Sequence, residues 1–335
     1  MIRRYVILGS AAAAAALASC SGGGNSSPTP TPTPTSSATP TPTPTATYTA
    51  FPLTAAAEFS TLNATTNYTG DPAAGAVTLG VTATETFTSR VKLAATTDLT
   101  NGTFVMDEAS EESRFTGTSV TTTAAPTVTE FVYRSVSTAT GAAAGNFSQL
   151  EVLNNIGAST VVTSDSFLKS LTVLSYANWW RGDSTTGQKR LTYSIWGYPT
   201  LSYDMLTTGT ATYTARIVGR AVSVNNNTTT IVRVGGTANV SVNFATGLVS
   251  TTMNLTTLPS GGAETPYVIL NAQGAIPIGQ NQFSGSVTAG SGIVGTITGA
   301  FYGSKGVNLG IVFGAAGSIN GIDTRVVGEV VGVKQ

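Results

Sequence analysis

The stretch ANVSVNFATGLVSTTMNL, residues 238–255, decides the fold class of this chain. Every second residue faces one side on both arms of an Ala-Thr-Gly turn, and that side is mostly apolar. Its members are Ala238, Val240, Val242 and Phe244 before the turn, then Val249, Thr251, Met253 and Leu255 after it. Side chains of a strand alternate between two faces, so this pattern predicts an antiparallel hairpin with one buried face.

The same period recurs on both sides of that hairpin. It is visible at 191–195 and 211–217, and further strands are expected at 282–287, 293–302, 309–313 and 324–333. About eight strands from residue 190 onward would close into a small barrel with a filled interior. Outer-membrane barrels alternate in a similar way. Short strands, several glycines and polar faces of Thr, Ser and Asn favour a soluble barrel.

The preceding segment, residues 51–185, is less regular. Strands are expected at 84–93, 131–137, 161–162 and 171–174, and one short helix at 145–156. A small acidic cluster, made by Asp107, Glu108, Glu111 and Glu112, lacks the regular ligand spacing of a calcium loop and is interpreted as a solvated turn.

Composition excludes several classes of function. The 335 residues contain no histidine, and Lys plus Arg balance Asp plus Glu at 16 each. Without histidine the common Ser/His and Cys/His nucleophile pairs and the usual zinc sites cannot form. The balanced charge argues against nucleic acid as a partner, because phosphate binding needs clustered cations. We predict neither catalytic residues, nor a metal site, nor a cofactor.

The N-terminus carries a targeting signal. Arg3 and Arg4 precede an apolar stretch, which ends in Leu17-Ala18-Ser19-Cys20. This layout indicates a signal peptide over residues 1–19. The last four residues resemble the lipobox of bacterial lipoproteins, in which the cysteine is acylated. Cys20 is the only cysteine, so no intramolecular disulfide is possible.

Residues 20–50 are expected to form a tether behind the acylated cysteine. Proline alternates with threonine over much of this range, which favours an extended, semi-rigid chain. A docking ligand for a proline-recognising domain is the alternative. Ser21, rather than an aspartate, follows the cysteine, and under enterobacterial-type sorting this favours the outer membrane.

Three glycine-containing stretches carry a resemblance to a known family. Gly197-Tyr198-Pro199-Thr200, followed by 209–213, resembles the segment leading into the barrel of transferrin-binding protein B and its relatives. Gly299-Ala300-Phe301-Tyr302-Gly303, followed by 310–313, resembles the run near the end of that barrel, and 236–244 fits the strand between them. The resemblance covers about the last 140 residues.

The resemblance implies an all-β chain with an antiparallel handle sheet, here 51–185, followed by a soluble eight-stranded β-barrel at 186–335. It also implies a lipid-anchored protein of the outer membrane, at the cell surface, that captures haem, host iron proteins or other ligands and passes them to a TonB-dependent receptor. The sequence departs from the family after Gly303, where Ser304 and Lys305 replace the usual proline and acidic residue. Only one lobe fits, whereas the transferrin-binding members carry two.

Candidate ligand-binding residues gather where the two halves meet. All three tryptophans of the chain lie within residues 176–198. An arginine beside aromatic side chains is common in binding hot spots. The candidates are Tyr176, Trp179, Trp180, Arg181, Trp196 and Tyr198. Core or interdomain packing is the alternative, because large aromatic residues dominate cores as well.

The sequence thus predicts a non-catalytic surface lipoprotein that binds a solute, a haem or iron source, or a host protein. An adhesin or structural cell-envelope lipoprotein without a role in uptake is the alternative. A hydrolase would need two of Asp183, Asp204 and Asp323 side by side, and no spacing supports that pairing. If haem were the ligand, tyrosine would have to supply the iron contact.

Overall fold

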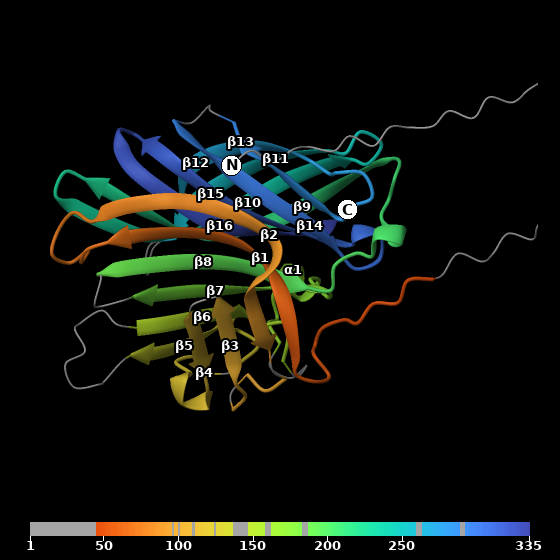
Figure 1. Cartoon of the computed structure of the whole chain (residues 1–335), viewed down its shortest axis with the longest axis horizontal. Helices are drawn as coiled ribbons and strands as arrows, with labels where there is room; N and C mark the ends of the chain where they lie inside the picture. Colours follow the sequence, from red (N-terminus) through yellow and green to blue (C-terminus); the bar gives the residue numbers. More distant parts are fainter. Residues whose placement is uncertain are drawn as a thin grey trace, which may run out of the picture. The chain divides into compact units, whose positions relative to one another are not determined.

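The computed structural model describes residues 45–95, 97–99, 101–108, 111–123, 125–136, 147–157, 162–182, 187–258, 263–288 and 292–335. These residues form an eight-stranded antiparallel sheet and a closed eight-stranded antiparallel barrel (Figure 1). The expected all-β class and the expected barrel are therefore confirmed. None of the helices in these ranges has the length and hydropathy needed to cross a membrane.

The sheet has the strand order β4-β3-β2-β1-β8-β7-β6-β5. Its strands are β1 Ala57–Thr69, β2 Thr78–Ala95, β3 Phe104–Glu108, β4 Glu111–Phe115, β5 Glu130–Val136, β6 Phe147–Leu153, β7 Leu174–Gly182 and β8 Gln188–Gly197. A single turn of helix, α1 Ser166–Lys169, lies between β6 and β7. Strand β1 pairs with both β2 and β8, so the chain's first and last sheet strands meet at the centre of the sheet.

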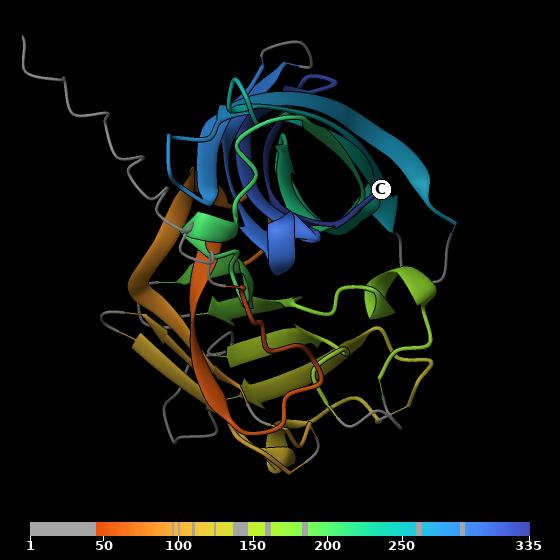
Figure 2. The same ribbon diagram turned by 90° about the vertical axis from the view of Figure 1, so that its right-hand side faces the viewer.

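The barrel is an up-and-down array closed by pairing of its first strand with its last. Its strands are β9 Thr210–Asn225, β10 Thr228–Asn243, β11 Leu248–Leu258, β12 Thr265–Ala275, β13 Gln282–Val287, β14 Ile293–Tyr302, β15 Asn308–Ile319 and β16 Ile322–Lys334. Figure 2 looks into the barrel and shows the sheet lying along one side of it.

Inward side chains fill the barrel, as strand alternation requires. Met253, Phe283, Phe301 and Phe313 are all essentially inaccessible to solvent within this core. Close packing explains why Gly299 lies opposite Phe283 on the next strand. A Cβ atom on Gly299 would come within 2.2 Å of the Phe283 ring, so this glycine has a structural role in the barrel.

Two further cores lie on opposite faces of the sheet. On the face toward the barrel, Leu62, Tyr193 and Ile195 pack with apolar residues of the barrel such as Val312 and Val327. On the other face, the sheet curls around its own core, which holds Phe104, Phe131, Trp179 and Trp196.

The expected start of the barrel at residue 186 is wrong. Strand β8, which contains the alternating run 191–195, pairs with β1 and β7 and so belongs to the sheet. The barrel begins at Thr210. The expected count of eight is nevertheless right, because β12 was missed in the sequence while β8 was wrongly included.

The expected helix at 145–156 is also wrong. Residues 147–153 form β6, which pairs with β5 and β7 in the middle of the curled sheet. Asp107 and Glu112 of the acidic cluster are opposite each other on the β3–β4 hairpin. Among the residues described, no group of acidic side chains is arranged to hold a metal ion.

Candidate functional site

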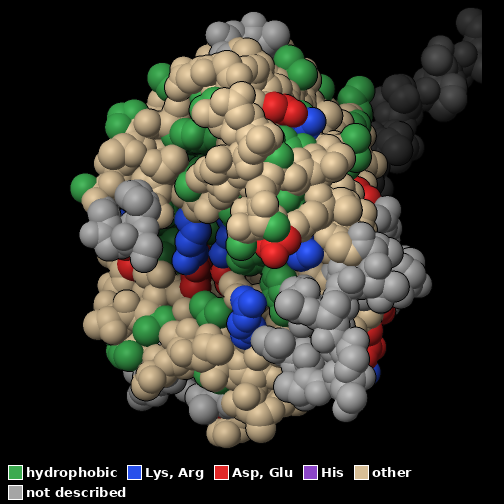
Figure 3. All heavy atoms as spheres, turned by 90° about the vertical axis from the view of Figure 1, so that its left-hand side faces the viewer, with side chains coloured by type: hydrophobic (Ala, Val, Ile, Leu, Met, Phe, Trp, Pro, Cys, Tyr) green, Lys and Arg blue, Asp and Glu red, His purple; other side chains and the backbone are tan. Residues whose placement is uncertain are grey.

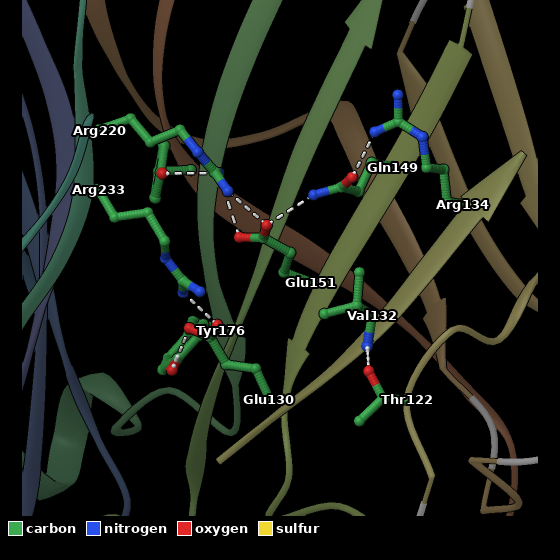
Figure 4. A network of polar contacts seen from close by, with 10 residues as sticks. Thr122, Glu130, Val132, Arg134, Gln149, Glu151, Tyr176, Arg220 and Arg233 are labelled. Carbon is green, nitrogen blue, oxygen red and sulfur yellow. Dashed lines mark hydrogen bonds and ion pairs between the residues drawn. The ribbon is translucent and has the colours of Figure 1, made fainter. Parts of the chain in front are cut away.

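A buried ion pair joins the sheet to the barrel (Figure 4). Arg220 of β9 points away from the barrel interior and binds both carboxylate oxygens of Glu151 on β6, at 2.5 and 3.1 Å. The same guanidinium donates to the Tyr193 hydroxyl of β8, also at 3.1 Å. The exposed fractions of the residues are 6% for Arg220 and 3% for Glu151. This two-point geometry fixes the barrel in one register on the sheet.

A second pair lies beside the first. Arg233 of β10 contacts the carboxylate of Glu130, and the Tyr176 hydroxyl donates to the other oxygen of that carboxylate at 2.9 Å. The hollow around this pair has a volume of about 540 Å³ and is also lined by Arg216. Arg216 in turn pairs with Asp165, which caps the N-terminus of α1. Glu130, Arg216 and Arg233 in this hollow are thus each ion-paired, and the fourth charged group of the lining, Glu264, accepts a hydrogen bond from the Thr256 hydroxyl.

The pKa of Glu151 reflects this arrangement. Burial alone would raise it, but the charge and the hydrogen bonds of Arg220 outweigh burial, so the net shift is downward. Glu151 is therefore held as a carboxylate.

Glu329 of β16 behaves in the opposite way. Its carboxyl is fully buried at the sheet–barrel interface and neither oxygen has a hydrogen-bond partner among the described residues. Burial raises its pKa well above the ordinary range, the charges of Glu130 and Glu151 add to the shift, and the nearby Asn178 amide offsets only part of it. The interface therefore favours protonated Glu329.

We name the contact between the sheet and the barrel, with Glu130, Glu151, Arg220, Arg233 and Glu329 at its centre, the polar seam. Figure 3 shows acidic and basic side chains gathered in a hollow across the middle of one face, whereas the surface above it is largely uncharged. None of the seam residues was singled out from the sequence. The sequence does hold one signal that could have identified them, which is a charged residue at an outward position within an otherwise apolar strand. Glu329, between Val327 and Val330, is an example.

The aromatic candidates do not lie together on one surface. Because β7 alternates, Tyr176 and Trp180 face the barrel, whereas Trp179 lies in the core on the other face of the sheet. Trp179 donates from Nε1 to the Ser148 hydroxyl at 2.8 Å, and the Arg181 guanidinium stacks 3.5 Å from its ring centroid.

The remaining two candidates pack against the chain that follows the tether and begins the sheet. Trp196 and Tyr198 both contact Phe51 and Phe59, with ring centroids 4.7 to 5.5 Å apart. Trp196 is fully buried. These contacts are of the kind expected if the aromatic residues serve in core packing. A ligand-binding role for the six candidates stays a prediction. Cys20 lies outside the described residues.

The three aspartates considered for a hydrolase do not form a dyad in the described part of the chain. Asp204 accepts hydrogen bonds from the Tyr48 hydroxyl and from the Lys305 backbone. Asp323 pairs with Arg325 near the other end of the barrel, and Asp183 lies outside the described residues.

Tyr48 holds the start of the described chain at one end of the barrel. Besides donating to Asp204, its hydroxyl accepts from the Leu201 backbone at 2.9 Å. Strand β9 begins at this end and the C-terminal Gln335 bonds to Thr212 close by. Figure 1 shows the chain joining the barrel at the same end as the C-terminus.

The opposite end of the barrel is open to solvent and is called the mouth here. Its pocket, of about 570 Å³, lies between the β9–β10 and β15–β16 hairpins. Apolar atoms of Val232, Tyr267 and Ile319 line it, and Asn225, Asn226, Asn227 and Asn320 surround it. The described residues offer no side-chain partner to these four amides, and no charged side chain lines the pocket.

The family model that matches describes the C-lobe and N-lobe beta barrels of Tf-binding protein B, and the match covers residues 205–333. This range corresponds to the barrel seen in the structure. Residues 205–333 are similar to the transferrin-binding protein B barrel family. The resemblance expected from the sequence is thereby confirmed for the barrel.

Solved structures also match at low sequence identity. One is a transferrin-binding protein B variant from Haemophilus parasuis, with 14% identity over 82% of this chain and 46% of that one, and a TM-score of 0.41. The haemoglobin receptor HpuA from Kingella denitrificans matches with 13% identity over 86% of this chain and 89% of that one, at a TM-score of 0.38. The chain thus spans less than half of the Haemophilus structure. A comparison with curated proteins finds no match.

Proposed function

We propose that this protein is a surface-exposed lipoprotein of the outer membrane that binds a ligand without transforming it. The lipobox-like Leu17-Ala18-Ser19-Cys20, the Thr-Pro tether and the transferrin-binding protein B-type barrel support this proposal together. The ligand is a solute, a haem or other iron source, or a host protein. It passes to a TonB-dependent receptor in the same membrane.

The mouth is the proposed recognition site, and one observation carries this choice. Tyr48 holds the end of the tether at the end of the barrel that is far from the mouth, so the chain that leads back to Cys20 leaves the barrel at that end and the mouth stays unobstructed by it. Buried apolar side chains such as Met253, Phe283 and Phe301 fill the middle of the barrel. Recognition therefore falls to surface groups, and the mouth combines an apolar floor with unpaired amides.

The lining of the mouth also limits the ligand. The part of a ligand that enters this pocket is expected to be uncharged, because the lining offers no charged side chain to pair with it. If haem binds at the mouth, Tyr267 is the side chain in the lining that can reach the iron, since the chain has no histidine.

Binding to cells that display the full chain tests the proposal. Labelled haem, haemoglobin and transferrin are each titrated against cells with the native chain and against cells with the mouth variant Asn225→Lys/Asn320→Lys, which changes two exposed residues of the pocket. Saturable binding of at least one ligand is expected, with a loss of at least about tenfold in affinity in the variant, because two charges would enter an uncharged pocket. Asn239→Lys/Asn271→Lys, on the barrel wall, is the matched control.

Two results would overturn the proposal. Binding that the mouth variant leaves unchanged would remove the mouth as the site. Absence of binding to all three ligands, with loss of cell attachment on deletion of the gene, would favour the adhesin alternative.

The anchor has a separate test. Replacing Cys20 by alanine is expected to abolish labelling by palmitate and to release the protein from the membrane fraction, because the acylated thiol is the only proposed attachment. Retention of the variant in the membrane fraction would contradict lipid anchoring at Cys20.

A further inference from the structure

One side of the barrel is almost free of charge. Of the chain's 16 Lys and Arg and 16 Asp and Glu residues, only Glu264 falls within residues 234–304. This range contains β11 to β14 and most of β10. Strands β11 and β12 lie on the side of the barrel away from the sheet in Figure 1. We call the outer surface made by residues 210–214 of β9, 237–243 of β10, 248–254 of β11 and 269–275 of β12 the wall.

Strand register arranges the wall's polar side chains in rows. Ser241 of β10 is opposite Thr212 of β9 and Ser250 of β11, and Ser250 is opposite Gln273 of β12. The row continues through Ser286 to Thr296 on β13 and β14.

A second row runs parallel to the first. Asn239 is opposite Thr214 and Thr252, and Thr252 is opposite Asn271. Neighbouring strands are about 4.8 Å apart, and side chains on one face repeat about every 7 Å along a strand. The wall is therefore a regular grid of hydroxyl and amide groups.

Most of these groups are available to a ligand. Asn239, Ser241, Asn271 and Gln273 are exposed, and they line a shallow groove of about 560 Å³ with their neighbours on both rows. Thr252 donates to the Asn271 side chain at 3.0 Å. In the described part of the chain, the side chains of Asn239, Ser241 and Gln273 have no hydrogen-bond partner.

We propose that the wall binds an extended neutral polysaccharide. Hydroxyl and amide groups both donate and accept, as the hydroxyl groups of a sugar do. The lack of cations excludes nucleic acids and other polyanions, which need charged partners. Repeated sugar units present hydroxyl groups at a regular spacing, which suits a grid better than a single pocket.

The ligand is a polymer rather than a monosaccharide because the groove is shallow. Each hydrogen bond formed with a ligand replaces one with water, so its net contribution is small. Several equivalent contacts along one chain are needed for measurable binding. This site is separate from the mouth and does not depend on the proposed function.

A pull-down with insoluble polymers tests the wall. The full lipidated chain, solubilised in detergent, is incubated with cellulose, with mannan and with cross-linked dextran, and with heparin-agarose as a polyanion. The test variant is Asn239→Ala/Asn271→Ala/Gln273→Ala. The matched control, Asn225→Ala/Asn227→Ala/Thr230→Ala, removes polar groups from the mouth instead.

The expected result is retention of the native chain on at least one neutral polymer and not on heparin. The wall variant is expected to bind at least about tenfold more weakly, and the mouth variant to bind as the native chain does. Equal binding by the wall variant, or no retention on any neutral polymer, would overturn the proposal. Sedimentation is measured in parallel, and a dimer that the wall variant dissociates would reassign the wall to contact with a second copy. A mouth variant that loses haem or protein binding but keeps polymer binding would separate the two proposals.

Discussion

The two sides of the barrel have opposite chemistry although the same alternation builds both. On the side that meets the sheet, outward positions carry Arg220 and Glu329, which are buried at the polar seam. On the wall, equivalent outward positions carry Asn239 and Ser241, which are exposed and uncharged. Outward residues of the barrel therefore bind the sheet on one side and remain exposed to ligands on the other.

The largest expected effect comes from breaking the seam at Arg220. Arg220→Met leaves the Glu151 carboxylate buried without its partner, which typically costs about 3–5 kcal/mol. Chemical denaturation of the full chain measures the change. The double variant Arg220→Met/Glu151→Leu removes both charges and is expected to recover much of the loss. A loss below about 1 kcal/mol in the single variant would show that the pair is not buried in solution.

Glu329→Gln is expected to have a smaller effect of the opposite sign, a gain in stability that depends on pH. The folded protein keeps a proton on Glu329 that the unfolded chain releases above its ordinary pKa of about 4.3. Stability from this group is therefore present at lower pH and is lost as pH rises toward the raised folded pKa. Glutamine never has to ionise, so the variant is expected to melt about 2–4 °C higher at pH 8.

The pH series supplies its own control for Glu329. The difference between Glu329→Gln and the native chain is expected to shrink as pH falls toward 4, where both states of the native chain hold the proton. A difference that grows toward acid would contradict a protonated Glu329.

A loss of stability is also expected for Tyr176→Phe. The change removes one hydrogen bond to Glu130 and leaves the ring in place, and a bond to a charged group contributes about 1.5–3 kcal/mol. Thermal unfolding measures it. Tyr198→Phe is the control, because among the described residues the Tyr198 side chain makes ring contacts and its hydroxyl has no hydrogen-bond partner. An equal loss in both variants would argue against the Glu130 bond.

The smallest expected effect lies on the wall. The triple variant Asn239→Ala/Asn271→Ala/Gln273→Ala should unfold within about 0.5 kcal/mol of the native chain, as exposed substitutions do. The same denaturation curves check this. A large loss would mean that the wall is needed for folding and would remove it as a free surface.

The barrel was largely predictable because most of its strands have one solvent-exposed face and one buried face. The runs at 282–287 and 293–302 match β13 and β14 to the residue. Strand β12 was missed because Pro266, Tyr267 and Ile269 at its start break the alternation of polar and apolar residues.

The sheet was less predictable because it is covered on both faces. The central strands β7 and β8 are buried almost throughout, so polar residues such as Asn178 and Ser194 stand beside tryptophan without a period-two signal. For the same reason the aromatic residues at 176–181 were expected to share one surface, whereas alternation along β7 places them on both faces of the sheet. The seam pairs residues as far apart in the sequence as Glu130 and Arg233, and no local pattern encodes that contact.

Hydrogen exchange on the full lipidated chain shows where a ligand sits on the barrel. Exchange is compared with and without a captured ligand from the cell-binding assay. Recognition at the mouth, away from the tether, predicts new protection at the mouth hairpins, 223–230 and 317–324, and unchanged exchange around 200–206 and 302–308 beside Tyr48. Protection confined to the Tyr48 end would contradict it.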